Sequence, residues 1–518
     1  MSKIITAKEA AALIKDGSTV AIGAMGLGGW PEEVAQAIEK RFFETGHPRD
    51  ISIKQGCATG DWKERGVNRL GHEGLVKKWA GAHIGSSKNM NKLMRENKIS
   101  AHCLPQGVIV NLWREIAAHR PGLITKVGLG TFVDPRLEGG KMNSVTTEDL
   151  VKIVEFEGEE YLFYKSFPVD VALIRGTTAD ENGNMTMCNE GWLYESLPIA
   201  QATKNTGGIV IIQVEYLAKA GTLHPKKVKV PGALVDYIVV ATKKEACWQT
   251  EGLYFDPSFS GDIKIPLEAV PKLPLSDRKV IARRANMELV RNAIVNLGYG
   301  LPADVATVAA EEGISELIIL TTEAGAFGGV PAPPPHFGNT YNAEAMIHHG
   351  SMFDFYDGGG LDVAFLGLAE VDQYGNVNVS KFGGSVTGPG GFINITQSAK
   401  KVVYVGNFTV GSETKVEDGK LVIVKEGKRK KFREHVEQVT FSGRYAYKNN
   451  QQVRYITERA VFSLEDGEVT LIEIAPGIDL DKDVLQHMDF RPNISPSIKT
   501  MDSRLFQPTW GELKNIIK

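Results

Sequence analysis

The sequence predicts an α/β protein made of two tandem, structurally related domains with mostly parallel sheets covered by helices. Two observations lead to this prediction. Short β-branched runs alternate with helical patterns along the chain, and two segments recur in the same order in both halves. The clearest apolar runs are 209–214, 235–240, 317–320 and 401–405. Such runs are typical of buried strands, and amphipathic segments such as 31–43 are typical of the helices that cover them.

The first recurring segment is a helix start that follows a glycine cluster. Pro31 with two glutamates resembles Pro302 with Asp304, at an offset of 302 − 31 = 271 residues. Both place proline in the first turn and an acid beside it, as the helix dipole favours.

The second recurrence pairs an Asp-Val-Ala segment, followed ten residues later by a second aspartate, in each half. Asp170 and Asp180 match Asp362 and Asp372, at an offset of 362 − 170 = 192. Two matches in the same order indicate a duplicated fold, with about 271 − 192 = 79 extra residues in the first half. A chance match of short segments is the alternative.

The predicted boundary between the halves is rich in proline. Segment 256–276 has little periodicity and reads as a linker. We therefore expect domains at 1–255 and 277–518, the second of which opens with a helix from about Asp277 to Asn296.

Composition excludes several classes of function. Lys plus Arg number 59 and Asp plus Glu 62 among 518 residues, and this net charge of −3 gives no footprint for nucleic acid or a membrane surface. The four cysteines lack CxxC spacing, which suits a reducing compartment and offers no metal framework. The N-terminus lacks the apolar core of a signal peptide, and no apolar run reaches membrane-spanning length. We expect a cytoplasmic protein with no metal, nucleic-acid or membrane partner.

The sharpest candidate for catalysis is Glu323, in Thr321-Thr322-Glu323-Ala324-Gly325, directly after a predicted strand. Ligands gather at the carboxyl ends of strands in open α/β sheets. A carboxylate there can act as a covalent nucleophile on an activated acyl group. The alternative is a glutamate that caps the next helix.

Two other segments offer hydrogen-bond donors. The glycine-rich loop 383–392 can present backbone amides to a developing oxyanion, or it can be a tight loop without a ligand. Gln106, in Pro105-Gln106-Gly107, offers an amide donor, although an ordinary loop is the alternative.

Three other motifs give weak or no support for other functions: a dinucleotide fingerprint, a pair of histidines and a basic run. Segment 298–303 matches the GxGxxA dinucleotide fingerprint, but it follows a helix-like stretch, 284–295, and the next strand ends in Thr321 and Thr322. His348 and His349 lack metal-ligand spacing and are interpreted as surface or core residues. The basic run 428–431 is interpreted as a solvated hairpin.

Taken together, several motifs resemble the class I (family I) CoA-transferases, in the order in which that family has them. The resemblance covers nearly the whole chain, and segment 353–362 looks especially like the single-chain propionate (acetate) CoA-transferases. Succinyl-CoA:3-oxoacid enzymes are similar but more distant. The motifs are 105–107, 296–302, 323–325, 388–391 and 456–462.

The resemblance implies a role for each candidate residue. Glu323 is implied as the nucleophile, with the Gly391 N–H and Gln106 as oxyanion donors. Many family members read Glu-Asn-Gly where this chain has Ala324, so acyl selectivity is expected to differ. The residues implied to bind CoA or the substrate are Asn296, Gly388, Gly390 and Gly26.

The expected reaction is a ping-pong transfer of CoA from a short-chain acyl-CoA to a carboxylate through a glutamyl-CoA thioester. CoA is then a substrate, and neither metal nor ATP is needed. The resemblance points to acetate, propionate, butyrate or lactate, and to a homo-oligomer, a dimer or a tetramer. The alternatives are an acyl-CoA hydrolase on the same fold, a dinucleotide-dependent oxidoreductase that uses segment 298–303, and a non-catalytic ligand-binding protein.

Overall fold

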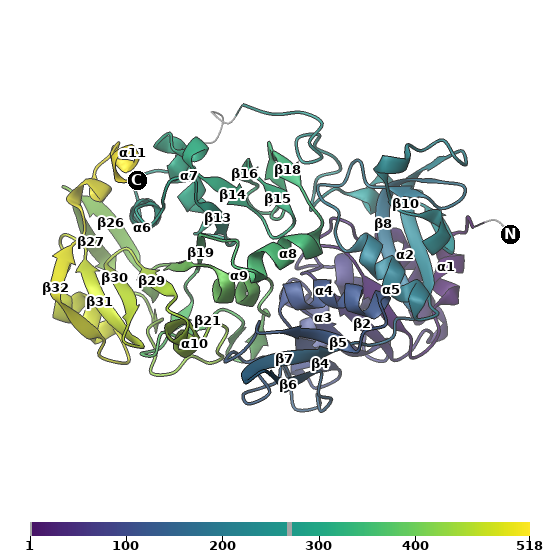
Figure 1. Cartoon of the computed structure of the whole chain (residues 1–518), viewed down its shortest axis with the longest axis horizontal. Coiled ribbons are helices and arrows are strands. Elements are labelled where there is room, and N and C mark those ends of the chain that lie inside the picture. Colours follow the sequence, from purple (N-terminus) through teal and green to yellow (C-terminus); the bar gives the residue numbers. More distant parts are fainter. Residues whose placement is uncertain (1–2, 267–271, 518) are drawn as a thin grey trace.

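The computed structural model describes residues 3–266 and 272–517. The chain forms two lobes, each built around a large sheet, with the N-terminus at the far end of one lobe and the C-terminus at the far end of the other (Figure 1). One hydrophobic core draws mainly on residues 10–240 and the other on residues 280–517. The predicted linker 256–276 includes 267–271, which lie outside the described residues, and the exact domain boundaries stay a prediction. Within the described ranges, no helix is both long enough and apolar enough to cross a bilayer.

The N-terminal sheet has a parallel centre in the order β12-β10-β8-β1-β2-β3-β4, to which β9 and β11 add antiparallel pairs. β5, β7 and β6 form a separate three-stranded antiparallel sheet, whose strands lie between residues 122 and 165. The strands are β1 (Thr19–Ile22), β2 (Ile51–Gln55), β3 (Val76–Gly81), β4 (Ser100–Cys103), β5 (Gly122–Thr125), β6 (Val151–Phe156), β7 (Glu159–Lys165), β8 (Val171–Asp180), β9 (Met185–Thr186), β10 (Ile209–Ala218), β11 (Val228–Val230) and β12 (Tyr237–Val240).

The C-terminal sheet has the parallel centre β29-β24-β19-β13-β14, extended by antiparallel pairs on both sides and by β32, which runs parallel to β31. Its strands are β13 (Ile294–Leu297), β14 (Ile319–Thr321), β15 (Ala326–Phe327), β18 (Ala345–Met346), β19 (Val363–Gly367), β24 (Lys401–Val405), β29 (Gln452–Ile456), β30 (Ala460–Glu465), β31 (Glu468–Ile474) and β32 (Asn493–Thr500). The predicted α/β class with mostly parallel sheets is confirmed.

The duplicated segments make the same hydrogen bonds in both halves. An oxygen of Asp170 accepts from the Thr19 N–H at 2.7 Å, and an oxygen of Asp362 accepts from the Ile294 N–H at 2.9 Å, each at the start of the neighbouring strand. Asp180 and Asp372 each bind the backbone N–H and side-chain amide of an asparagine four residues on. The repeat seen in the sequence is therefore a repeat of structure.

Helices cover both sheets, and two of them begin where the proline repeat predicts. Pro31 precedes α2 (Glu32–Thr45), and Pro302 precedes α7 (Ala303–Glu311). The other helices of at least seven residues are α1 (Ala7–Leu13), α3 (Lys88–Arg95), α4 (Gln106–Ala117), α5 (Ser196–Asn205), α6 (Asp277–Asn286), α8 (His349–Asp357) and α9 (Phe392–Ser398).

One predicted helix is wrong in its second half. The helix expected from Asp277 to Asn296 ends at Asn286, and residues 294–297 form β13 instead. Asn292, with a left-handed φ of 61°, lies in the turn just before β13, and β13 pairs with strands on both sides. Pairing in the sheet overrides the local helical pattern. As a result the GxGxxA segment does follow a strand, contrary to the argument made from the sequence.

Three helices meet where the two lobes join. α4 from the first half contacts α8 and α9 from the second, between the lobes (Figure 1). The Gly107 N–H donates to Asn394 Oδ1 at 3.1 Å, and Asn111 Nδ2 donates to Asp354 Oδ1 at 3.0 Å. The candidate site lies around this junction.

Candidate active site

Glu323 lies in a tight turn between β14 and β15. The Thr322 N–H donates to the Ala326 oxygen at 3.1 Å, and the Gly325 N–H donates to the Thr322 oxygen at 3.0 Å. Gly325 has a φ of +119°, and a Cβ there would collide with the carbonyl oxygen of Ile347. The next element is a strand, so the interpretation of Glu323 as the cap of a following helix is wrong.

The Glu323 side chain is buried at the junction of the halves, with 8% of its surface exposed. Its neighbour Ala324 packs into the hydrophobic core of the N-terminal half, although it belongs to the C-terminal half of the chain. Burial raises the pKa of the Glu323 carboxyl. The site thus holds a carboxylate that has lost most of its hydration, which makes it a stronger nucleophile than a solvated one.

The glycine-rich loop is attached to the opposite half of the chain. Gly388 has a φ of +88°, and a Cβ on it would lie 2.5 Å from the Ala82 oxygen. The Gly390 N–H donates to the same oxygen at 2.9 Å, and the Gln106 N–H donates to the Gly390 oxygen at 3.0 Å. These contacts hold the loop against the start of α4.

The two donors expected to bind an oxyanion are neighbours at this contact. Gln106 is the first residue of α4 and is 3% exposed, and a Cβ on Gly390 would lie 3.7 Å from its Oε1. Gly391 is buried, and no acceptor among the described residues takes its N–H. Gly391 directly precedes α9, and the first N–H groups of a helix have no partner within it, so the Gly391 N–H is available to an oxygen of the substrate.

Asn296 lies behind the nucleophile turn. It is fully buried, and its Nδ2 donates to the Thr321 oxygen at 3.4 Å and to the Tyr356 hydroxyl at 3.2 Å. The first of these contacts holds Thr321, the last residue of β14, two residues before Glu323. A role for Asn296 in CoA binding stays a prediction.

Gly26 lies in a separate turn of the N-terminal half. It has a φ of +57°, its N–H donates to the Ala58 oxygen at 2.7 Å, and its own oxygen accepts from the Gly60 N–H at 3.0 Å. Among the described residues no hydrogen bond joins it to Glu323, so its substrate-binding role also stays a prediction.

Sequence reasoning missed a buried chain of polar groups beside Glu323. His349 Nε2 lies 3.0 Å from Gln106 Nε2, and His349 Nδ1 lies 2.5 Å from Glu195 Oε1. Cys57 Sγ lies 3.6 Å from the same glutamate oxygen. The sequence interpretation makes His349 a surface or core residue, and the structure buries it completely. It is separated by 154 and 243 residues from its two partners, so no local pattern could have joined them.

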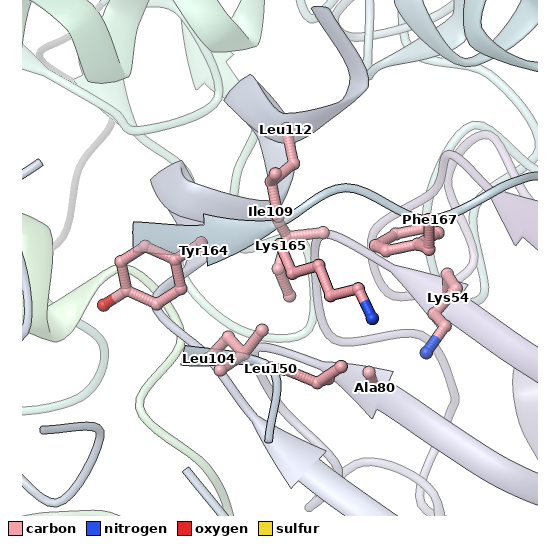
Figure 2. A pocket seen from close by; sticks show the side chains of 9 residues that line it. All are labelled: Lys54, Ala80, Leu104, Ile109, Leu112, Leu150, Tyr164, Lys165 and Phe167. Atoms are coloured by element: carbon pink, nitrogen blue, oxygen red, sulfur yellow. The ribbon is translucent and has the colours of Figure 1, made fainter. Parts of the chain in front are cut away.

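A small apolar cavity lies beside α4, which contributes Ile109 and Leu112 to its lining (Figure 2). Its volume of about 10 Å³ admits about one water molecule, so it is not the substrate site. Lys54 and Phe167 lie side by side at one end, with the amine 5.0 Å from the ring centre, and Tyr164 lies at the other (Figure 2). Burial lowers the pKa of Lys54 to about 8.

The two-lobed α/β fold, with the buried Glu323 at the end of a strand, agrees with one class of protein. The chain belongs to the family I CoA-transferases, and residues 4–241 match the family described as Coenzyme A transferase.

Relatives of known activity match along the entire chain. The chain is 64% identical over 522 residues to caffeate CoA-transferase of Acetobacterium woodii, which covers all of both proteins. It is 45% identical over 507 residues to acetate CoA-transferase YdiF of Escherichia coli K12, which covers 97% of this chain and 95% of YdiF.

Solved structures agree with this assignment. The apoenzyme of acyl-CoA transferase YdiF from E. coli O157:H7 superposes with a TM-score of 0.94 at 44% identity, over 98% of this chain and 97% of that one. A thioester complex of the same enzyme with CoA gives a TM-score of 0.93. The chain is therefore a CoA-transferase, and its fold is that of YdiF.

Proposed function

We propose that Glu323 is the nucleophile of this CoA-transferase and that it carries CoA as a glutamyl thioester between two carboxylic acids. The observation behind this proposal is the buried Glu323 carboxylate, in a rigid turn, at the junction that also holds Gln106 and the unpaired Gly391 N–H. The YdiF–CoA thioester complex supports the same chemistry.

The first half-reaction begins with attack of the ionised Glu323 on the thioester carbonyl carbon of an acyl-CoA. The carbonyl oxygen becomes an oxyanion, to which the Gly391 N–H and the Gln106 amide donate. The C–S bond then breaks, CoA leaves as a thiolate, and an acyl-glutamyl anhydride remains. Loss of one oxyanion donor typically costs about 2.7–4 kcal/mol.

In the next step the CoA thiolate attacks the glutamyl carbonyl of the anhydride. The acyl carboxylate leaves, and Glu323 is now a thioester of CoA. An incoming carboxylate reverses both steps and departs as the new acyl-CoA. Since one thioester is exchanged for another, neither ATP nor a metal ion is required.

The reaction depends on the exclusion of water, because hydrolysis of the anhydride or the thioester would destroy the activated bond. Burial of Glu323 between the two halves serves this purpose. It also favours transfer over the alternative acyl-CoA hydrolase, which needs water at the same carbon. The oxidoreductase alternative lacks support, because every relative named above is a CoA- or acyl-CoA transferase.

For the acid, we propose a phenylpropenoate of the caffeate type, on the strength of 64% identity over the whole chain to caffeate CoA-transferase. The short-chain acids expected from the sequence are the second candidate, which the similarity to acetate CoA-transferase YdiF favours.

Intact mass spectrometry tests the nucleophile. Wild-type protein mixed with acetyl-CoA alone should gain the mass of CoA less water, mapped to the peptide that holds Glu323, and Glu323→Gln should not. Glu344→Gln is the matched control, because Glu344 is an exposed glutamate of the same segment. An unlabelled wild type, or an adduct on another residue, would refute the proposal.

Competing acceptors test the substrate. With acetyl-CoA as donor, we expect a higher kcat/KM for caffeate than for propionate or butyrate. A preference for the short acids would overturn the aromatic assignment and leave the transferase mechanism intact. Release of CoA without an acceptor at a comparable rate would identify a hydrolase instead.

A further inference from the structure

Helix α8 faces both donors of the proposed oxyanion site. His349 and Phe353 lie four residues apart and therefore on the same face of the helix. His349 contacts the Gln106 amide, and a Cβ on Gly391 would lie 3.3 Å from the Phe353 ring. The same ring would lie 2.5 Å from a Cβ on Gly107, the residue after Gln106. The two donors thus rest on one turn of one helix.

His349 lies between a carboxylate and a carboxamide, out of contact with solvent. His349 and Glu195 have fully buried side chains, and Glu195 is the residue that precedes α5. Their Nδ1–Oε1 distance of 2.5 Å places the ring nitrogen in direct hydrogen-bond contact with the carboxyl group. The second oxygen of Glu195 has no partner among the described residues, and its first oxygen contacts both His349 and the Cys57 thiol.

The neighbours of the ring fix where its hydrogen lies. A carboxylate oxygen only accepts, so His349 Nδ1 carries the hydrogen that points at Glu195. An amide nitrogen only donates, so His349 Nε2 must be the bare, accepting nitrogen that faces Gln106. The contact uses one of the two N–H bonds of the Gln106 amide and leaves the other for the substrate.

We propose that His349, held by Glu195, is a positioning residue that aims the second N–H of Gln106 at the thioester oxygen in the transition state. The inference rests on the proposed role of Gln106 as an oxyanion donor. A terminal amide turns freely about its last torsion unless it is anchored, and an oxyanion donor works best when it is oriented in advance. The accepting ring supplies that anchor from the opposite half of the chain.

The cluster also resembles a metal site in outline. One ligand atom each of Cys57, Glu195 and His349 lie within 4.8 Å of one another. Burial and the adjacent carboxylates raise the pKa of the Cys57 thiol, so it keeps its proton and donates to Glu195. The atoms therefore already satisfy each other as donors and acceptors, and this favours the hydrogen-bonded chain.

Two substitutions of His349 separate positioning from mere packing. His349→Asn keeps a donor for Glu195 but removes the acceptor for Gln106, whereas His349→Gln can place an acceptor where Nε2 lies. We expect His349→Asn to lower kcat by about 10- to 100-fold with KM within about twofold, because a misaimed donor loses part of what its deletion would lose. His349→Gln should retain kcat within about fivefold. His348→Gln, at the exposed neighbouring histidine, is the control and should match wild type.

A double-mutant cycle then tests the coupling. Gln106→Ala should lower kcat by about 10²- to 10³-fold, and His349→Asn added to it should lower kcat by no more than about twofold further. A full additional loss, or equal losses for His349→Asn and His349→Gln, would show a structural role and overturn the inference. A small effect of Gln106→Ala would instead refute the oxyanion role on which it rests.

Glu195→Gln provides a second route if the His349 variants do not fold. The amide can accept or donate, so it no longer forces the hydrogen onto Nδ1. We expect kcat to fall by about tenfold with KM unchanged, because the bare nitrogen faces Gln106 only part of the time. A kcat equal to that of wild type would overturn the inference.

Discussion

The attachment of the glycine-rich loop to the opposite half can be tested by Gly388→Ala. A Cβ there would lie 2.5 Å from the Ala82 oxygen, whereas ordinary contact begins at 3.4 Å, so one side must move by about 3.4 − 2.5 = 0.9 Å. Gly390 binds the same oxygen through its N–H, and Gly391 follows directly. The displacement therefore acts on the backbone that carries the proposed donor.

The expected effect is larger on catalysis than on folding. A misplacement of about 1 Å in a reacting site can cost about 100-fold in rate, so we expect kcat to fall by roughly that factor. The left-handed backbone adds a cost to stability of about 1–2 kcal/mol for alanine. Steady-state kinetics with acetyl-CoA and caffeate, together with a thermal melt, measure the two effects.

Gly384→Ala is the matched control. Gly384 has a comparable φ of +75°, but a Cβ on it meets no atom within 4 Å. It should therefore share the loss of stability and keep kcat within about threefold of wild type. Equal kcat values for the two variants would refute the claim that the Ala82 contact places the donor.

Three further predictions concern the nucleophile, its neighbour and a buried lysine. Burial raises the pKa of Glu323, and the ionised form is the one that attacks. We therefore expect kcat/KM to fall on acidification with a midpoint above the ordinary value of 4.5. A midpoint at or below 4.5 would contradict the burial argument. Ala324→Asn places a larger polar side chain in the N-terminal core, so it should lower the Tm. It should also shift the ratio of kcat/KM values from caffeate towards acetate. An unchanged ratio would show that residue 324 does not influence acceptor selectivity. Lys54→Met should stabilise the protein at pH 7 by up to about 3 kcal/mol, because the charged amine is buried. Because the folded protein loses the Lys54 proton near pH 8 and the unfolded chain near 10.5, that advantage should shrink as the pH rises between these values, and a pH-independent difference in melts would refute the assignment.

The sequence anticipated the duplicated fold because the same residue types recur in the same order at equivalent places of the two halves. Asp170 and Asp362 each bind the first N–H of a neighbouring strand, and Asp180 and Asp372 each close a turn on an asparagine four residues away. The aspartate–asparagine turns close within four residues and leave a short motif, whereas the strand contacts of Asp170 and Asp362 span 151 and 68 residues. A local pattern also marks Glu323, which sits where a strand ends.

Prediction failed where long-range pairing decided the outcome. The stretch after Asn286 has a helical pattern, but β14 and β19 recruit residues 294–297 into the sheet from both sides. His349 gave no signal because its partners come from remote parts of the chain. Local propensity carries no information about such neighbours.

The sequence by itself determined the class of fold, its duplication, the acidic residue after β14 and the family, since each depends on residues close together along the chain. Only the tertiary structure decided that Glu323 is buried, that the loop at Gly388 rests on Ala82 and that His349 joins Glu195 to Gln106. Burial and hydrogen-bond geometry arise when the two halves pack together, and a linear pattern does not record which side chains that packing brings into contact.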